Sequence, residues 1–179
     1  MRTGRGWWRW AVPTPKTSDP LALLDALNAD GVEYVVVGGA AAVLHGAPVT
    51  TQDLDIVHRL SPENIGRLQR CLSRMHAVVR ERGSRGLVPD QSMLQAGGQV
   101  RLLTDFGPLD VLGRLHDGRD YDELVGHSEL VGDATRRVRV IDLATLIQIK
   151  GSNQTAARPS GAADSSRPPV PAPLRIWRV

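Results

Sequence analysis

The chain reads Tyr34-Val35-Val36-Val37-Gly38-Gly39 and, further on, Thr51-Gln52-Asp53-Leu54-Asp55-Ile56-Val57. The first stretch is an apolar run that ends in a glycine pair, which predicts a strand followed by a tight turn into a helix. In the second stretch, acidic and apolar residues alternate. Because alternate side chains of a strand point to the same face, Asp53 and Asp55 are expected together on one face, with Leu54 and Ile56 turned to the core.

These two features predict a site for a phosphate and a metal ion. Glycine has no Cβ, so the backbone at Gly38 and Gly39 can approach a phosphate at the start of the helix. Two carboxylates side by side raise each other's pKa unless a cation neutralises them. Each feature alone also has a structural explanation, a tight turn for the glycines and a solvated sheet edge for Asp53 and Asp55. Their order and spacing favour the functional interpretation.

A third aspartate follows in the stretch Thr104-Asp105-Phe106-Gly107-Pro108-Leu109-Asp110-Val111-Leu112. Gly107-Pro108 is a turn signal between two apolar runs, 100–103 and 109–112, so the segment predicts a hairpin. Asp110 interrupts the second strand of that hairpin. Without the first motif, an aspartate near a strand end would be the simpler interpretation.

Together these motifs resemble the signature of the nucleotidyltransferase superfamily that includes DNA polymerase beta. The resemblance is greatest to its small bacterial branch, which contains the minimal nucleotidyltransferases and the AbiEii-type toxins. The matching elements are Gly38-Gly39-Ala40-Ala41, His45-Gly46, Thr51-Gln52-Asp53-Leu54-Asp55 and the phrase from Thr104 to Leu112. The resemblance covers roughly residues 21–150 and implies an α/β (α+β) nucleotidyltransferase fold, with a small mixed twisted sheet flanked by helices.

The resemblance also implies an activity: magnesium-dependent transfer of a nucleoside monophosphate from an NTP to an acceptor hydroxyl. In that family, residues at the positions of Asp53 and Asp55 hold two Mg²⁺ ions, and the residue at Asp110 ligates the ion that activates the acceptor. A set of oxygen ligands without a Cys or His cluster suits Mg²⁺ better than zinc. The implied nucleotide contacts are made by Gly38, Gly39 and Thr51.

Lys150 is a fourth candidate catalytic residue. Asp142 is a capping signal for a final helix that contains Leu143, Leu146, Ile147 and Ile149 and is expected to end at Lys150. By resemblance, this lysine contacts the triphosphate or supports transfer, a role that suits a mobile point charge. A basic residue that complements a helix C-terminus is the alternative.

Three regions are predicted along the chain: a flexible N-terminal extension at 1–18, a nucleotidyltransferase core at 19–150, and a disordered tail at 151–179. The extension carries three of the four tryptophans, and the tail is rich in Ala, Ser, Arg and Pro without helical or strand periodicity. Since relatives continue as a helix here, the tail also suggests a change of reading frame. Within the core, residues 76–99 predict an irregular connection.

Composition adds weak constraints. The net charge of +3 comes from an arginine excess, because lysine occurs only at Lys16 and Lys150. Such a surface is compatible with a nucleic-acid acceptor, although only 4% of the residues are aromatic, which gives little sign of a base-stacking platform. The single cysteine, Cys71, excludes an internal disulfide. With neither a long apolar stretch nor a signal peptide, the sequence predicts a cytoplasmic protein without a membrane span.

Partners and alternatives follow from the resemblance. The implied substrates are an NTP and an acceptor that is a tRNA end, a protein side chain or a small molecule, and a toxin of a toxin–antitoxin pair would bind a cognate antitoxin. After Lys150 the sequence no longer matches the family pattern. This mismatch supports an alternative, in which the chain is a truncated, non-catalytic relative that acts as a partner-binding module. A metal-dependent phosphohydrolase is a third, weaker hypothesis.

Overall fold

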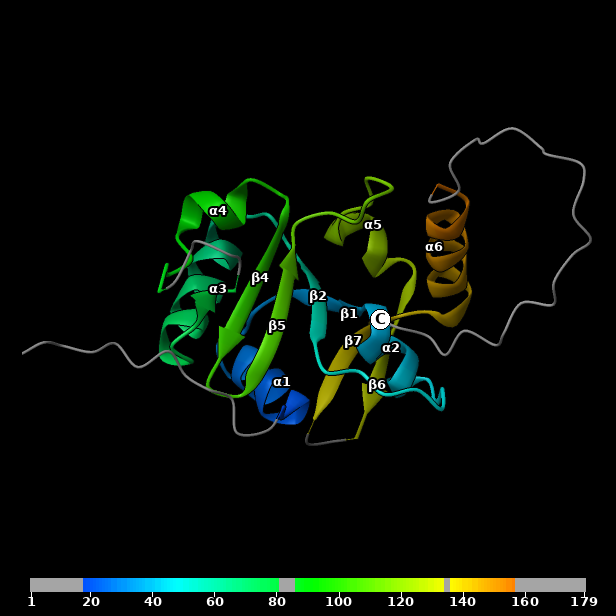
Figure 1. The fold of residues 1–179 in the computed structure, drawn as a ribbon, viewed down its shortest axis with the longest axis horizontal. Coiled ribbons are helices and arrows are strands. Elements are labelled where there is room, and N and C mark those ends of the chain that lie inside the picture. Colours follow the sequence, from blue (N-terminus) through cyan, green and yellow to red (C-terminus); the bar gives the residue numbers. More distant parts are fainter. Residues whose placement is uncertain (1–17, 81–85, 134–135, 157–179) are drawn as a thin grey trace, which may run out of the picture.

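The structure is a computed structural model that describes residues 18–80, 86–133 and 136–156. Within these ranges, seven strands form one mixed sheet in the spatial order β3-β4-β5-β2-β1-β7-β6 (Figure 1). The strands are β1 (Tyr34–Val37), β2 (Leu54–His58), β3 (Val78–Val79), β4 (Gln99–Thr104), β5 (Gly107–Leu112), β6 (Ser128–Gly132) and β7 (Arg137–Ile141).

Helices flank this sheet: α1 (Pro20–Ala29), α2 (Gly38–Leu44), α3 (Pro62–Arg74), α4 (Gln91–Gln95), α5 (Tyr121–Val125) and α6 (Leu143–Ala156). In Figure 1, α3 lies beside α4, and α2 lies near α6 on the other side of the central strands. Asp19-Pro20 and Ser61-Pro62 are sequence signals for the start of a helix. The Asp19 and Ser61 side chains accept hydrogen bonds from the first turns of α1 and α3, so both N-caps are present. Among the helices of the described ranges, none has the length and hydropathy needed to cross a bilayer.

The central strand β1 explains the apolar run that precedes the glycine pair. All four of its residues are buried, because β1 lies between β2 and β7 inside the sheet and helices α2 and α5 pack against it. Strands covered on both faces read as continuous apolar runs rather than as alternating ones. Leu54 and Ile56 of β2 are buried, at 1% and 0% exposure, as the alternating pattern predicts.

The register of β2 decides where the acidic residues lie. Strand β2 runs parallel to β5 with Asp55 beside Asp110, and antiparallel to β1 with Asp55 beside Val37. Gly38 therefore starts α2 next to the Asp55 carboxylate, and Asp53 lies immediately before β2. Three segments that are distant in the sequence thus meet at one end of the central strands.

Several sequence-based expectations need correction. The hairpin is present, but its turn lies at Asp105 and Phe106, and Gly107-Pro108 begins β5. Thr104 closes this turn, because its hydroxyl accepts from the Phe106 N–H and donates to the Gly107 carbonyl. The connection predicted as irregular contains β3 and α4. Strand β6 was not predicted.

The end of the final helix is a further correction. Helix α6 does not end at Lys150 but continues to Ala156. Glycine in a helix interior costs only about 1 kcal/mol relative to alanine, and the first proline after Lys150 is Pro159. The disordered tail and the flexible extension remain predictions, because residues 157–179 and 1–17 lie outside the described residues.

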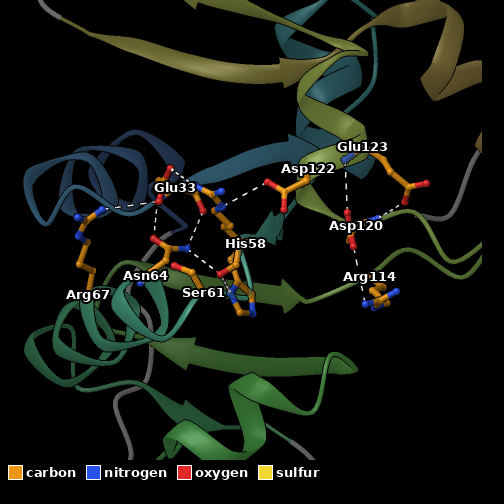
Figure 2. Close-up of polar contacts among 10 residues, drawn as sticks. Glu33, His58, Ser61, Asn64, Arg67, Arg114, Asp120, Asp122 and Glu123 are labelled. Atoms are coloured by element: carbon orange, nitrogen blue, oxygen red, sulfur yellow. Dashed lines mark hydrogen bonds and ion pairs between the residues drawn. The ribbon is translucent and has the colours of Figure 1, made fainter.

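One buried side chain joins α3 to the segments next to β1 and β2 (Figure 2). Asn64, in the first turn of α3, is fully buried. Its Oδ1 accepts from the Glu33 N–H at 2.7 Å, and its Nδ2 donates to the carbonyls of Glu33 at 2.9 Å and Arg59 at 3.0 Å. Asn64 thereby fixes the residue before β1 against the residue after β2.

We predict that Asn64→Ala lowers the free energy of unfolding by about 3 kcal/mol, because the Glu33 N–H loses its acceptor and the carbonyls of Glu33 and Arg59 each lose one of their donors. Urea denaturation measures the change. Arg70→Ala, on the exposed side of the same helix, is the matched control and should shift stability by no more than about 0.5 kcal/mol. Equal stabilities of the two variants would contradict this role of Asn64.

Candidate active site

Asp53, Asp55 and Asp110 meet at one polar cavity of about 710 Å³. Asp55 and Asp110 are register partners in β2 and β5, and Asp53 enters the same cavity from the residue before β2. Asp110 is 5% exposed, whereas Asp53 and Asp55 are half-buried. The rest of the lining is polar: Thr50, Thr51, Gln52, Arg80, Gln99 and Arg101.

Gly38 makes room for the Asp55 carboxylate. Its φ of +66° lies in the left-handed region, and a Cβ at this position would lie 2.2 Å from Asp55 Oδ2 and 2.8 Å from its Cγ. Any other residue would therefore be strained and would also collide with Asp55. The backbone N–H of Gly39 donates a hydrogen bond to the same carboxylate. In this structure, the glycine pair positions a candidate metal ligand.

The local environment disfavours negative charge on two of the three carboxylates. Burial, and then the neighbouring Asp110 and Asp53, raise the pKa of Asp55 to about 6, while the Gly39 N–H and Lys150 oppose that shift. Burial likewise raises the pKa of Asp110, against the opposing effect of Arg80. A site that concentrates buried carboxylates in this way is stabilised by an added cation.

An arginine already lies among these carboxylates. Arg80 Nη2 is 3.0 Å from Asp53 Oδ2 and 3.2 Å from Asp110 Oδ1. Gln99 Nε2 donates to Asp110 Oδ2 at 2.9 Å, and Arg101 Nε lies 3.8 Å from the same oxygen. Arg80 follows β3 directly, in the segment predicted to be irregular, and the sequence contains no local signal that would have placed it here.

A second, mostly apolar cavity of about 370 Å³ also borders Asp55. Its lining is Val37, Gly38, Asp55, Gln99, Leu112, Leu115, His116, Leu146, Ile149 and Lys150. Asp55 and Gln99 thus border both cavities. The fold brings Lys150 of α6 to the apolar cavity together with Gly38, although the two residues are far apart in the sequence.

Thr51 has a local structural partner. Its hydroxyl donates to the Asp53 carbonyl at 2.9 Å, which holds the chain in position just before β2. Thr51 also lines the polar cavity. The structure therefore brings every candidate site residue to one of the two cavities or, for Gly39, to the Asp55 carboxylate.

The carboxylates of Asp53, Asp55 and Asp110 are chemically suitable ligands for Mg²⁺. Carboxylate oxygens are the ligands that Mg²⁺ takes from proteins, usually with substrate phosphates and water completing the octahedron. Within the described ranges, however, no group of three or more His, Cys, Asp or Glu side chains is arranged so that it could hold a metal ion. The position of Arg80 between Asp53 and Asp110 is consistent with that finding.

Comparison with known proteins identifies the fold. No protein-family model matches the chain, and no curated protein matches its sequence. A candidate nucleotidyltransferase from Thermotoga maritima is 21% identical, with a TM-score of 0.53 over 76% of this chain and 83% of that one. The antibiotic-resistance factor ANT(2'')-Ia is 16% identical, with a TM-score of 0.51 over 81% of this chain and 75% of that one. The predicted nucleotidyltransferase fold is confirmed.

We predict that Gly38→Ala is more destabilising than Gly31→Ala. Both glycines have a left-handed φ, at +66° and +64°, but a Cβ at Gly31 meets nothing within 4 Å. The Gly31 variant should lose about 1 kcal/mol from backbone strain alone, and the Gly38 variant should lose distinctly more, because it also displaces Asp55. Urea denaturation of both variants measures the difference.

Gly38→Ala should lose more unfolding free energy than Gly31→Ala. This additional loss should disappear when Asp55 is truncated to alanine, because the colliding carboxylate is then absent. A double-mutant cycle with Asp55→Ala tests this coupling. If the additional loss persists in the Asp55→Ala background, the close approach is not its cause.

Proposed function

We propose that this chain, which has the nucleotidyltransferase fold, transfers a nucleoside monophosphate from an NTP to an acceptor hydroxyl in a magnesium-dependent reaction that releases pyrophosphate. The observation that carries the proposal is the convergence of Asp53, Asp55 and Asp110 on one cavity from two neighbouring strands. The structural similarity to nucleotidyltransferases supports the reaction type. Fold alone does not select a reaction, so the argument depends on the carboxylates.

In this proposal, Asp53, Asp55 and Asp110 would hold the Mg²⁺ ions. Bound magnesium would neutralise the triphosphate and activate the attacking hydroxyl. The cluster has the oxygen ligands and the excess negative charge that such ions need. Gly38 and the Gly39 N–H keep the Asp55 carboxylate in place, and the glycine pair and Thr51 are the predicted contacts to the phosphates.

The two cavities suit the two substrates. The apolar cavity offers Leu112, Leu115 and Ile149 as a surface for a nucleobase, and the Lys150 ammonium as a charge for phosphates. The larger polar cavity contains all three carboxylates and suits the acceptor. The resemblance implies an acceptor that is a tRNA end, a protein side chain or a small molecule. Its AbiEii-type toxin branch implies a cognate antitoxin as partner.

A second candidate function is a non-catalytic module that binds a protein or nucleic-acid partner. One observation favours it: Arg80 already pairs with Asp53 and Asp110, so the folded chain has a counter-ion without metal. Metal-dependent nucleotide binding separates the two functions, because only the transferase requires it.

We predict that the protein incubated with Mg²⁺ and each of the four labelled NTPs, in the presence of total cell RNA and protein, links one nucleotide to an acceptor. Asp55→Asn should lower this transfer about a hundredfold or more, the effect expected when a group that stabilises transition-state charge is lost. The matched control is Asp105→Asn, which changes an exposed aspartate of the β4–β5 turn and should leave transfer unchanged.

Thermal unfolding separates lost chemistry from lost folding. Without metal, Asp55→Asn should be as stable as the wild type or slightly more stable, because it removes one of three crowded charges. Mg²⁺ with NTP should stabilise the wild type by mass action and the variant far less. Equal ligand-induced stabilisation, or undiminished transfer by the variant, would exclude Asp55 as a metal ligand and favour the binding module.

A further inference from the structure

Arg80 occupies the position that a metal ion would need. A single nitrogen, Nη2, bridges an oxygen of Asp53 at 3.0 Å and an oxygen of Asp110 at 3.2 Å. A magnesium ion ligated by the same two carboxylates would lie about 2.0–2.1 Å from their oxygens. The gap between the two carboxylates therefore holds the guanidinium or the metal, but not both.

We propose that Arg80 is the resident counter-ion of the aspartate cluster, and that a divalent metal ion must displace it from between Asp53 and Asp110. The inference rests on the proposed function for the presence of a metal ion. It concerns competition for the carboxylates and can be measured without any transfer reaction.

The backbone of Arg80 can stay in place while its side chain leaves. The Arg80 N–H donates to the Arg101 carbonyl at 2.8 Å, which anchors the backbone to β4. The Arg80 side chain is 33% exposed and lines the polar cavity, so it has open space to rotate into. A long, flexible arginine side chain on an anchored backbone fits a counter-ion that is exchanged rather than fixed.

Asp55 offers the metal an approach that Arg80 does not cover. Among the ion pairs of the described residues, those of Arg80 involve Asp53 and Asp110, and none involves Asp55. Asp55 instead accepts from the Gly39 N–H and borders both cavities. A metal ion that first meets Asp55 can then replace the guanidinium on the other two carboxylates.

Displacement of Arg80 would also change the polar cavity. The guanidinium that neutralised two carboxylates would face that cavity as an unpaired cation, and the cavity lining also includes Thr50 and Gln52. Loading the site with metal would thus add positive charge to the cavity proposed for the acceptor.

The test measures Mn²⁺ binding by electron paramagnetic resonance of the free ion, without nucleotide. Arg80→Gln should bind Mn²⁺ about tenfold more tightly than the wild type, because the ion no longer displaces a charge-assisted pair of hydrogen bonds. Arg80→Lys, which keeps the charge but lacks the planar fork, should have an intermediate affinity. The matched control, Arg74→Gln, removes an exposed arginine that pairs with Asp30, and should bind like the wild type.

Chemical denaturation gives a second readout. Without metal, Arg80→Gln should be less stable than the wild type, because the carboxylates lose their counter-ion. Saturating Mn²⁺ should stabilise Arg80→Gln by more than it stabilises the wild type. Equal or weaker Mn²⁺ binding by Arg80→Gln would overturn this inference alone. No Mn²⁺ binding by either protein would overturn both the inference and the magnesium dependence of the proposed function. If Arg80→Gln fails to fold, Arg80→Lys is measured in its place. An Arg80→Lys variant that binds Mn²⁺ with the same affinity as the wild type would overturn the inference.

Discussion

The crowding of three carboxylates at one end of the central strands is the constraint on which the rest of the structure depends. The parallel register of β2 and β5 places Asp55 beside Asp110, and burial of the pair raises the pKa of Asp55 to about 6. Neighbouring groups compensate: Gly38 leaves room for one carboxylate, and Arg80 bridges the others. Since apolar packing often stabilises a fold more than buried charge does, this cluster is better explained by function than by stability.

The same arrangement divides the surroundings of Asp55 into two chemically different halves. One cavity is bounded by leucines, an isoleucine and Lys150, the other by threonines, glutamines and arginines. The proposed transfer reaction needs two substrates bound next to the same catalytic groups. Asp55 borders both cavities, so substrates bound in the two cavities would both lie next to its carboxylate. The central strands position the carboxylates. Helix α6 supplies Lys150, and the residue after the edge strand β3 supplies Arg80.

The sequence predicted the elements whose pattern is local. The buried run before Gly38, the acidic alternation of β2 and the capped starts of α1 and α3 are each encoded within a few residues. The sequence did not predict Arg80 at the site, for two reasons. Strand β3 has two residues and helix α4 has five, and such short elements show no periodicity. The contact between Arg80 and Asp53 also depends on the pairing of β3, β4 and β5, which is not encoded locally. Helix α6 passes Lys150 because glycine and serine weaken a helix without ending it.

The most direct measurement is anomalous diffraction from crystals of the protein soaked with Mn²⁺ and a non-hydrolysable NTP analogue. The account predicts manganese bound to oxygens of Asp53, Asp55 and Asp110 at about 2.1 Å, with the nucleotide in the cavity that contains Lys150 and with Arg80 turned away from the carboxylates. Nucleotide or manganese bound elsewhere, or Arg80 still bridging Asp53 and Asp110 in crystals saturated with metal, would contradict it.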